Sequence, residues 1–329
     1  MVKLSYSPYE LQPKSALNAV TENQVRKGFL VRCDWQGQIG FADVCSWPVF
    51  GDPTRDELIE DLKKGRIDHP LLQQALWFCR RTSGFDSDSW AEARDKVASM
   101  KSHRLITDLS KAPDLSQTPF TKVKMGRDLK LETHALLQLA EAYPKTKWRL
   151  DFNSSMKPDD FEAWAVSLGG TKSQIDYIED PSPYNSRQWA DWQKRFQVSL
   201  ALDMTPDEEP HGGFDVLVVK PAKQGLSDVE WIVRRHPGLR VVGTTYLGHP
   251  LTDLLSAYFM ATLYSEFEME AEVGGYYSGH QFEPQQGFPA LGFEKGCLKP
   301  QPGMHWGYGG VLENIPWIAA GEIDRLSHG

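Results

Sequence analysis

The stretch WRLDFN, residues 148–153, shows the pattern that decides the fold: a short apolar run that ends in two polar residues, Asp151 and Asn153. Similar short apolar runs with polar residues at or near their ends occur twice before this stretch and four times after it. Apolar runs of this length are typical of strands buried on both faces of a parallel sheet. The other six are RLITDL (104–109), FTKVKM (120–125), IDYIED (175–180), VSLALDM (198–204), VLVVKP (216–221) and LRVVGTTY (239–246).

Amphipathic helical segments separate these runs, for example RDLKLETHALLQLAEAY (127–143) and SDVEWIVRRH (227–236). Repeated β-α units leave two architectures, an open doubly wound sheet and a closed barrel. No GxGxxG motif follows the first run, which argues against a dinucleotide-binding sheet and thus against an NAD enzyme. Polar residues end at least five successive runs, and in a barrel such residues converge on one mouth. We therefore predict an α/β fold built on a (β/α) barrel, a modified TIM barrel.

The N-terminal third follows a different order, in which β-like pieces precede a series of helical stretches. KLSYSPYEL, GFLVRCDW and IGFADV come first, and DELIEDLKKG, PLLQQALWFCRR and SWAEARDKVASM follow. Strands followed by helices indicate a separate α+β domain. We predict a capping domain at 1–100 and a catalytic barrel at 101–299. The Gly-, Pro- and aromatic-rich tail is expected to close the barrel, and its last part, about 300–329, to join the capping domain.

Composition narrows the functional class. The net charge of −8 over 329 residues opposes binding to nucleic acid or to an anionic membrane. The four cysteines are far apart and form no CxxC pair, and the N-terminus has no apolar signal region. The longest apolar stretch has about eleven residues, too few to cross a bilayer. We expect a cytoplasmic enzyme. The sequence has no heptad pattern from which an oligomeric state could be predicted.

Charged residues end successive strands at the predicted mouth of the barrel. Side chains alternate along a strand, so residues two apart point to the same side. Three carboxylates that converge repel one another unless a cation lies between them, and an all-oxygen site of this charge suits Mg²⁺. In chain order the residues are Lys122, Lys124, Asp151, Glu179, Asp203 and Lys220.

The lysines indicate proton transfer. Two ammonium groups at positions i and i+2 beside a divalent cation lower each other's proton affinity, so that one of them can act as a base. Lys220 arrives from the opposite side of the mouth, which places a substrate between two lysine faces. These parts describe removal of a proton next to a carboxylate, with Mg²⁺ stabilising the resulting enediolate. The expected partner is therefore a small-molecule carboxylate.

This ordered set resembles the muconate-lactonizing branch of the enolase superfamily, whose lysine or histidine bases work with Mg²⁺. The resemblance covers nearly the whole chain, because RKGFLVRCDWQGQIGFADVCSWPVFG (26–51) is similar to the capping-domain hairpin and the specificity loop of that branch. Within it, the compact length, RLDFN (149–153) and VLVVKPAKQG (216–225) are most similar to the o-succinylbenzoate synthase family.

The resemblance implies a lyase of menaquinone biosynthesis. Its reaction is the syn dehydration of 2-succinyl-6-hydroxy-2,4-cyclohexadiene-1-carboxylate to o-succinylbenzoate. By this likeness Lys124 is the base and then protonates the leaving hydroxyl, while Lys122 holds the substrate carboxylate. Lys220 stabilises the enediolate from the other ring face. The implied Mg²⁺ ligands are Asp151, Glu179 and Asp203, with Mn²⁺ as a substitute ion.

Four further residues are expected to contact substrate: Asn153, Thr244, Thr245 and Arg149. For Arg149, which should point inward one layer deeper than Asp151, neutralisation of the carboxylates is the alternative. The loop 46–51 is a candidate lid, or else packs the cap on the barrel. His249 is the one histidine with a candidate role.

Two alternatives to the synthase remain. An N-acylamino acid racemase or dipeptide epimerase uses the same scaffold and lysines on both faces, so the catalytic set does not separate it from the synthase. The segment TTYLG (244–248) offers no acid for a substrate ammonium, which favours the synthase. A non-catalytic scaffold of this fold is the second alternative, and it is disfavoured because all six expected positions are filled.

Overall fold

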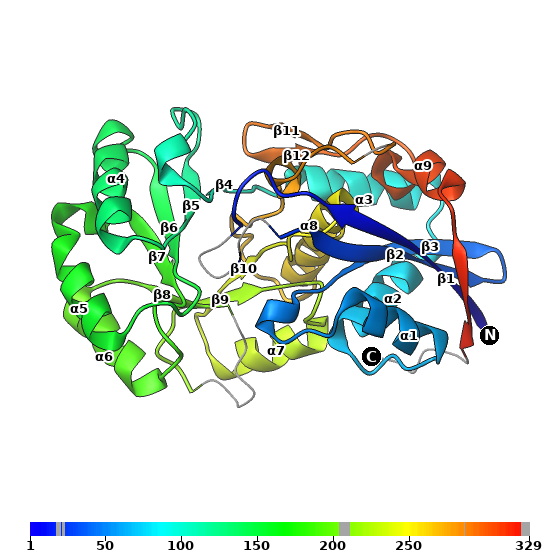
Figure 1. Ribbon diagram of the computed structural model, residues 1–329, viewed down its shortest axis with the longest axis horizontal. Coiled ribbons are helices and arrows are strands. Elements are labelled where there is room, and N and C mark those ends of the chain that lie inside the picture. The colour runs from blue at the N-terminus through cyan, green and yellow to red at the C-terminus, as the bar shows by residue number, and fades with distance from the viewer. Residues whose placement is uncertain (18–20, 22–23, 204–210, 286, 324–329) are drawn as a thin grey trace.

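The computed structural model describes residues 1–17, 21, 24–203, 211–285 and 287–323. A curled parallel sheet forms the centre of its barrel part (Figure 1). All seven predicted runs contain a strand of this sheet, whose order is β10-β9-β8-β7-β6-β5-β4. Neighbours in the sheet are also neighbours in sequence, as expected for a barrel of β-α units. The strands are β4 (Arg104–Ile106), β5 (Phe120–Lys124), β6 (Lys147–Asp151), β7 (Ile175–Glu179), β8 (Leu200–Leu202), β9 (Val216–Val219) and β10 (Arg240–Gly243).

Two glycines close the barrel between β10 and β4. Gly274 N–H donates to Lys101 O at 2.8 Å, and the amide of His103 donates to Gly274 O at 2.7 Å. On the other side, Gly275 N–H donates to Gly243 O at 2.9 Å, and Thr245 N–H donates to Gly275 O at 2.9 Å. The segment 274–275 therefore takes the eighth place, where sequence periodicity gave no strand.

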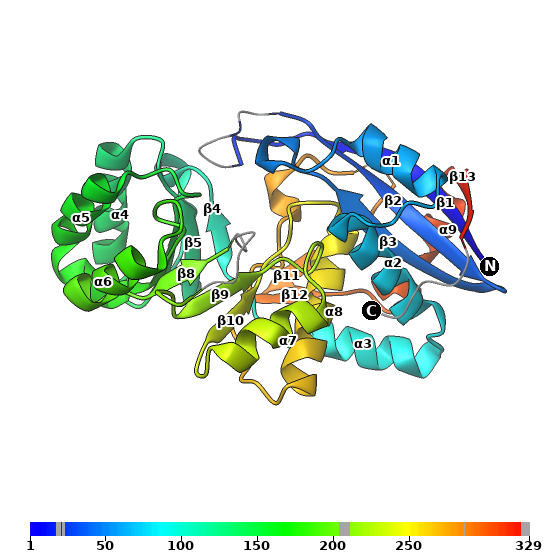
Figure 2. The same cartoon turned by 90° about the horizontal axis from the view of Figure 1, so that it is seen from below.

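Helices cover the outside of the sheet, and Figure 2 shows α4, α5 and α6 around strands β5–β8. Side-chain caps begin two of them: Asp128 accepts from Leu131 N and Asn185 from Gln188 N. The longest, α8, is buried on nearly all sides because it packs between the barrel and the cap. None of the helices in the described part of the chain could span a membrane. The barrel helices are α4 (Leu129–Ala142), α5 (Pro158–Ser167), α6 (Ser186–Phe196), α7 (Leu226–Arg235) and α8 (Pro250–Glu266).

An antiparallel sheet of order β13-β1-β2-β3 forms the cap. The edge strand β13 comes from the C-terminal tail and pairs with β1, from Val2↔Ile323 to Tyr6↔Ile318 (Figure 1). Residues 324–329 of the predicted tail lie outside the described residues. The cap contains β1 (Val2–Leu11), β2 (Arg26–Trp35), β3 (Gln38–Cys45), α1 (Arg55–Lys63), α2 (Pro70–Ser83), α3 (Ser87–Ser99) and β13 (Ile318–Ile323). The tail also forms β11 (Gly292–Glu294), β12 (Cys297–Lys299) and α9 (Gly309–Asn314).

Buried polar contacts join the cap to the barrel. The carboxylate of Asp43 on β3 accepts from Tyr9 Oη at 2.5 Å, from the amide of His249 at 2.9 Å and from Thr252 Oγ1 at 2.7 Å. Tyr9 lies in the cap, whereas His249 and Thr252 lie at the start of α8. Because these groups are buried and paired, the contacts hold the loop after β10 in one position relative to the cap.

Candidate active site

A cavity of about 240 Å³ lies at the carboxyl ends of the barrel strands. The barrel contributes the ends of β5 and β9 and the loop after β10, and the cap contributes Trp47 and Phe50. Sites at this end of a (β/α) barrel are built from strand ends and the loops that follow them. The predicted residues that line the cavity are Lys122, Lys124, Asn153, Asp203, Lys220, Thr244 and Thr245.

The three predicted metal ligands lie together. Asp151 and Glu179 are paired neighbours at the ends of β6 and β7, and Asp203 directly follows β8. One carboxylate oxygen from each lies within 4.8 Å of the others, and all three side chains are buried. Strand pairing thus brings into one cluster three acids that are 28 and 24 residues apart in sequence.

Each carboxylate has a lysine partner. Lys122 Nζ lies 2.6 Å from Glu179 Oε1 and 2.7 Å from Asp151 Oδ2. Lys124 Nζ lies 2.5 Å from the same Asp151 Oδ2. Lys220 Nζ lies 2.9 Å from Asp203 Oδ1 and donates to Thr244 Oγ1 at 2.6 Å. Two lysines therefore share one oxygen on one wall, and the third reaches the cluster from β9.

The cluster carries more negative charge than its burial favours. Burial raises the pKa of Glu179 well above its usual value, and the charge of Asp151 adds to this, although Lys122 opposes both. Burial and the charge of Asp203 raise the pKa of Asp180, the next residue, to about 8. Burial also acts to raise the pKa of Asp151, but Lys122 and Lys124 outweigh it and hold that pKa well below the usual value.

These residues fit a divalent metal ion. The donor set is three carboxylates, which suits a hard cation such as Mg²⁺, and a cation would relieve their repulsion. Among the described residues none donates a well-oriented hydrogen bond to Asp203 Oδ1, whose partner is the ammonium of Lys220 at 2.9 Å, so this oxygen can also bind an ion. The candidate ligands are Asp151, Glu179 and Asp203.

Three of the four predicted substrate contacts reach the cavity. Asn153 lies beside the base candidate, with its Oδ1 3.3 Å from Lys124 Nζ. Thr244 and Thr245 follow β10, and Thr244 accepts the hydrogen bond of Lys220. These three side chains therefore line the cavity between the two lysine walls.

Arg149, the fourth, does not line the cavity and does not pair with the three acids. Its buried guanidinium lies deeper in the barrel than the cavity, 2.7 Å from Asp176 Oδ2 and 3.7 Å from Glu272 Oε2. Its Nη1 also contacts Val273 O, and lies 3.2 Å from His103 Nδ1. The alternation of side chains along the strand correctly predicted that Arg149 points into the barrel. The residue nevertheless lies one layer too deep for direct contact with substrate.

His249 also lies outside the cavity. Its ring packs between Tyr9 and Phe288, with centroids 5.2 and 4.3 Å away, and its Nδ1 accepts from Leu251 N at 3.1 Å. Burial lowers the pKa of His249 to about 3. The residue is a neutral cap of α8 within the joint between cap and barrel.

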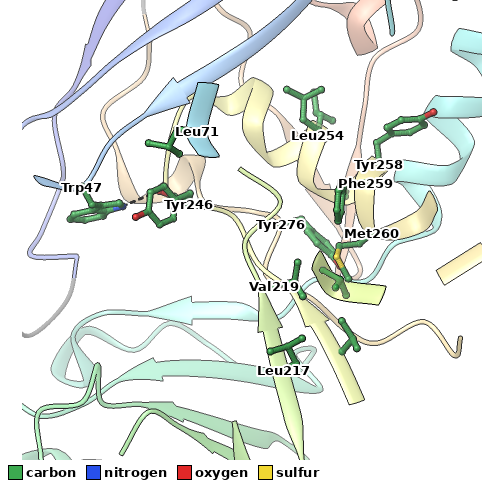
Figure 3. Packing of buried hydrophobic residues seen from close by; sticks show 14 of the residues in the cluster. Trp47, Leu71, Leu217, Val219, Tyr246, Leu254, Tyr258, Phe259, Met260 and Tyr276 are labelled. Carbon is green, nitrogen blue, oxygen red and sulfur yellow. Dashed lines mark hydrogen bonds between the residues drawn. The ribbon is translucent and has the colours of Figure 1, made fainter. Parts of the chain in front are cut away.

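Loop 46–51 of the cap forms part of the cavity wall. The Trp47 indole donates from Nε1 to Tyr246 O at 3.0 Å, the contact drawn in Figure 3. Phe50 packs against Trp47 with ring centroids 5.5 Å apart. The loop therefore packs the cap on the barrel, as one of the two alternatives predicted, and its aromatic side chains also line the cavity; its role as a lid stays a prediction.

Sequence reasoning missed several residues of the cavity wall. His103 directly precedes β4 and Leu105 lies on it, and both line the cavity. Because residues two apart along a strand point to the same side, the predicted strand at 104–109 could have identified both. Tyr277 and Ser278 follow the glycine segment that closes the barrel, where periodicity is absent.

Comparison with known proteins agrees with this arrangement. Residues 4–83 match the family described as O-succinylbenzoate synthase, N-terminal domain. The o-succinylbenzoate synthase of Bdellovibrio bacteriovorus is 34% identical over 267 residues, which cover 76% of this chain and 78% of that protein.

Solved structures share the fold. A mandelate racemase/muconate lactonizing protein from Herpetosiphon aurantiacus superposes with a TM-score of 0.72 at 14% identity, covering 92% of this chain and 96% of that one. The o-succinylbenzoate synthase of Thermosynechococcus elongatus BP-1, solved with Mg in its active site, has a TM-score of 0.61 at 19% identity, with coverages of 86% and 94%.

A (β/α) barrel under an α+β cap is the fold that this chain shares with these two proteins, and in this chain the mouth of the barrel holds three acids between lysines. The N-terminal match and the relative that is 34% identical narrow this fold class. The chain belongs to the o-succinylbenzoate synthase family, and is accordingly a lyase.

Proposed function

We propose that the cavity dehydrates 2-succinyl-6-hydroxy-2,4-cyclohexadiene-1-carboxylate to o-succinylbenzoate, with Lys124 as base and acid. The observation that carries this proposal is the sharing of Asp151 Oδ2 by Lys122 and Lys124, while Lys220 faces them from β9. A proton next to a carboxylate can thus be removed on one face and the resulting charge held from the other.

Asp151, Glu179 and Asp203 would hold Mg²⁺, with Mn²⁺ as a substitute. Bound there, the ion would stabilise the negative charge that develops on the substrate carboxylate. Lys122, fixed between two acids, would hold that carboxylate from the protein side.

Lys124 would act twice. As a neutral amine it takes the proton from the carbon that bears the carboxylate, and the C–H electron pair moves into an enediolate. The new ammonium of Lys124 then protonates the departing hydroxyl on the same face. The C–O bond breaks, the ring becomes aromatic, one water leaves and Lys124 is again neutral.

Lys220 would lie over the opposite face of the ring and stabilise the enediolate as a cation beside a π-system. Its hydrogen bond to Thr244 directs the ammonium group into the cavity. Asn153, Thr244 and Thr245 would contact the substrate.

We place the enzyme in the cytoplasm, because none of its four cysteines forms a disulfide. We also propose domain limits of 1–100 with about 300–329 for the cap and 101–299 for the barrel. The pairing of β13 with β1 supports the assignment of the tail to the cap.

An ultraviolet assay with freshly prepared cyclohexadiene substrate tests the proposal. Conversion is expected to stop with EDTA and to return with Mg²⁺. Lys124→Ala is expected to abolish turnover, whereas Lys147→Ala should not, because Lys147 lies at the far end of β6 and is exposed. Substantial turnover by Lys124→Ala would refute the assignment of the base.

The racemase alternative has a separate readout. If the protein does not convert the cyclohexadiene, exchange of the α-proton of N-acylamino acids or dipeptides in D₂O would identify the other activity. Exchange without dehydration would replace the proposed reaction while leaving the lysine roles in place.

A further inference from the structure

His103 presents an unused hydrogen-bond donor in the cavity wall. It directly precedes β4, its side chain is only 4% exposed, and it lines the cavity beside Leu105 and Lys122. Among the described residues none accepts a hydrogen bond from its Nε2, since the one contact of the ring nitrogens is that of Nδ1 with Arg149. This nitrogen therefore remains available to a molecule bound in the cavity.

Arg149 determines which ring nitrogen carries the proton. Its Nη1 lies 3.2 Å from His103 Nδ1, and a guanidinium group can only donate. Nδ1 must therefore accept, which leaves the proton of a neutral imidazole on Nε2. Burial holds the pKa of His103 well below its usual value, and the positive charges of Arg149, Lys122 and Lys220 add to this, so the ring is neutral.

Gly275 leaves room for this ring. A Cβ atom at position 275 would lie 2.6 Å from His103 Nε2 and 2.9 Å from Cε1. Any other residue would push the imidazole away from the closing segment 274–275. The ring is thus held on one side by Arg149 and on the other by a backbone without a side chain.

The position of His103 indicates which part of the substrate it meets. In the ring of eight places formed by the strands and 274–275, β4 lies opposite β8, and 274–275 lies opposite β7. The acids that would hold Mg²⁺, and with it the ring carboxylate, end or follow β6, β7 and β8, so His103 faces the part of the substrate that extends away from them.

We infer that His103 Nε2–H donates a hydrogen bond to an acceptor oxygen of the substrate's succinyl chain, and that Arg149 is a positioning residue that acts through His103. The inference rests on the proposed function for the identity of the substrate. The acceptor is a carbonyl-type oxygen, either of the ketone or of the terminal carboxylate.

Binding of the product and of an analogue distinguishes the ketone oxygen from the terminal carboxylate as the acceptor. Calorimetry with o-succinylbenzoate and with 2-butanoylbenzoate, which lacks the terminal carboxylate, is carried out on wild type, His103→Leu and His103→Gln. His103→Leu is expected to bind o-succinylbenzoate about tenfold more weakly, and His103→Gln to recover part of the affinity because its amide donates. If the terminal carboxylate is the acceptor, 2-butanoylbenzoate binds equally to all three; if the ketone is, both ligands weaken in His103→Leu.

Gly275→Ala is a second test, because it keeps the His103 side chain but moves its ring away from the closing segment. We expect weaker product binding here too. The control is His305→Gln, a buried imidazole packed between Phe41 and Trp90 away from the cavity, which should bind the product as wild type does.

The role of Arg149 has a spectroscopic test. ¹⁵N chemical shifts of the His103 ring should report an Nε2–H tautomer in wild type and a mixture in Arg149→Met, a change that a purely structural role would not produce. Wild-type product affinity in His103→Leu, or an Nδ1–H tautomer in wild type, would overturn the inference. Failure of wild type to dehydrate the cyclohexadiene would instead count against the proposed function, and the tautomer would remain measurable.

Discussion

Replacement of Arg26 by Met should loosen the joint between the cap and the barrel. Arg26 lies on β2 and is 4% exposed. It donates from Nη1 to Ser46 O, from Nη2 to Tyr246 O at 3.1 Å and from Nε to Leu247 O at 3.3 Å. Ser46 belongs to the cap loop and the other two to the loop after β10, so one guanidinium joins both loops.

The expected loss of stability is about 3 kcal/mol. Hydrogen bonds to a charged donor contribute roughly 1.5 kcal/mol or more each, and the 3.3 Å contact contributes least. The guanidinium also lies 3.5 Å from the Trp47 ring centroid, which adds roughly 1 kcal/mol. Met retains most of the apolar packing and removes the cost of burying a charge, which offsets part of the sum. At roughly 2–4 °C per kcal/mol, Tm should fall by about 6–12 °C.

Urea denaturation and steady-state kinetics check this together. Both loops line the cavity, so KM should rise in Arg26→Met even under conditions where the variant is fully folded. Lys27→Ala is the matched control on the same strand: its ammonium is exposed and lies 3.9 Å from Glu10, so stability should change by less than about 0.5 kcal/mol. A loss below about 1 kcal/mol in Arg26→Met, with KM unchanged, would show that this joint does not depend on Arg26.

Three more perturbations follow from the same structure. Mg²⁺ at one hundred times its Kd should stabilise the protein by about 2.7 kcal/mol, and Asp203→Asn should remove this thermal shift; an equal shift in that variant would argue against the acid cluster as the site. Since burial lowers the pKa of His249 to about 3, the neutral folded form is favoured above pH 6.5, and about 2 kcal/mol is lost by pH 5 as the unfolded state takes up a proton. His249→Gln should flatten this acid slope in denaturation curves, and an unchanged slope would assign it to other histidines. Gly243→Ala places a Cβ 2.2 Å from Met260 Cγ and should cost about 1–3 kcal/mol by calorimetry, a neutral result meaning that Met260 repacks freely.

The parts of the fold that were predictable are those with a repeated physical cause. Strands such as β6 and β9 are buried on both faces, so they need apolar runs, and their polar ends mark one edge of the sheet. The closing segment 274–275 carries no such mark. This segment closes the barrel through backbone hydrogen bonds alone. Position 275 requires glycine because any Cβ atom there would collide with His103.

The site could be predicted to the same extent, and the prediction that was wrong, for Arg149, has a related cause. Alternation along a strand gives the side to which a residue points, which sufficed for Lys122, Lys124 and Asp151. It does not give the depth at which that side chain ends. Arg149 points inward as expected, yet its long guanidinium reaches Asp176 and Glu272 and contacts the cavity only through His103.

The elements that carry the proposed chemistry differ in kind from those that shape the cavity. The lysines and acids lie on or beside strands, whose ladders hold them against their mutual repulsion. The wall that meets the rest of a substrate comes from loops, and Asp52 joins two of them by accepting from Trp47 N at 2.8 Å and from Tyr246 Oη at 2.9 Å. Because those loops belong to different domains, the cavity has its shape only while the cap is docked. Changes in substrate should therefore arise from substitutions at the joint between cap and barrel, with the lysines and acids unchanged.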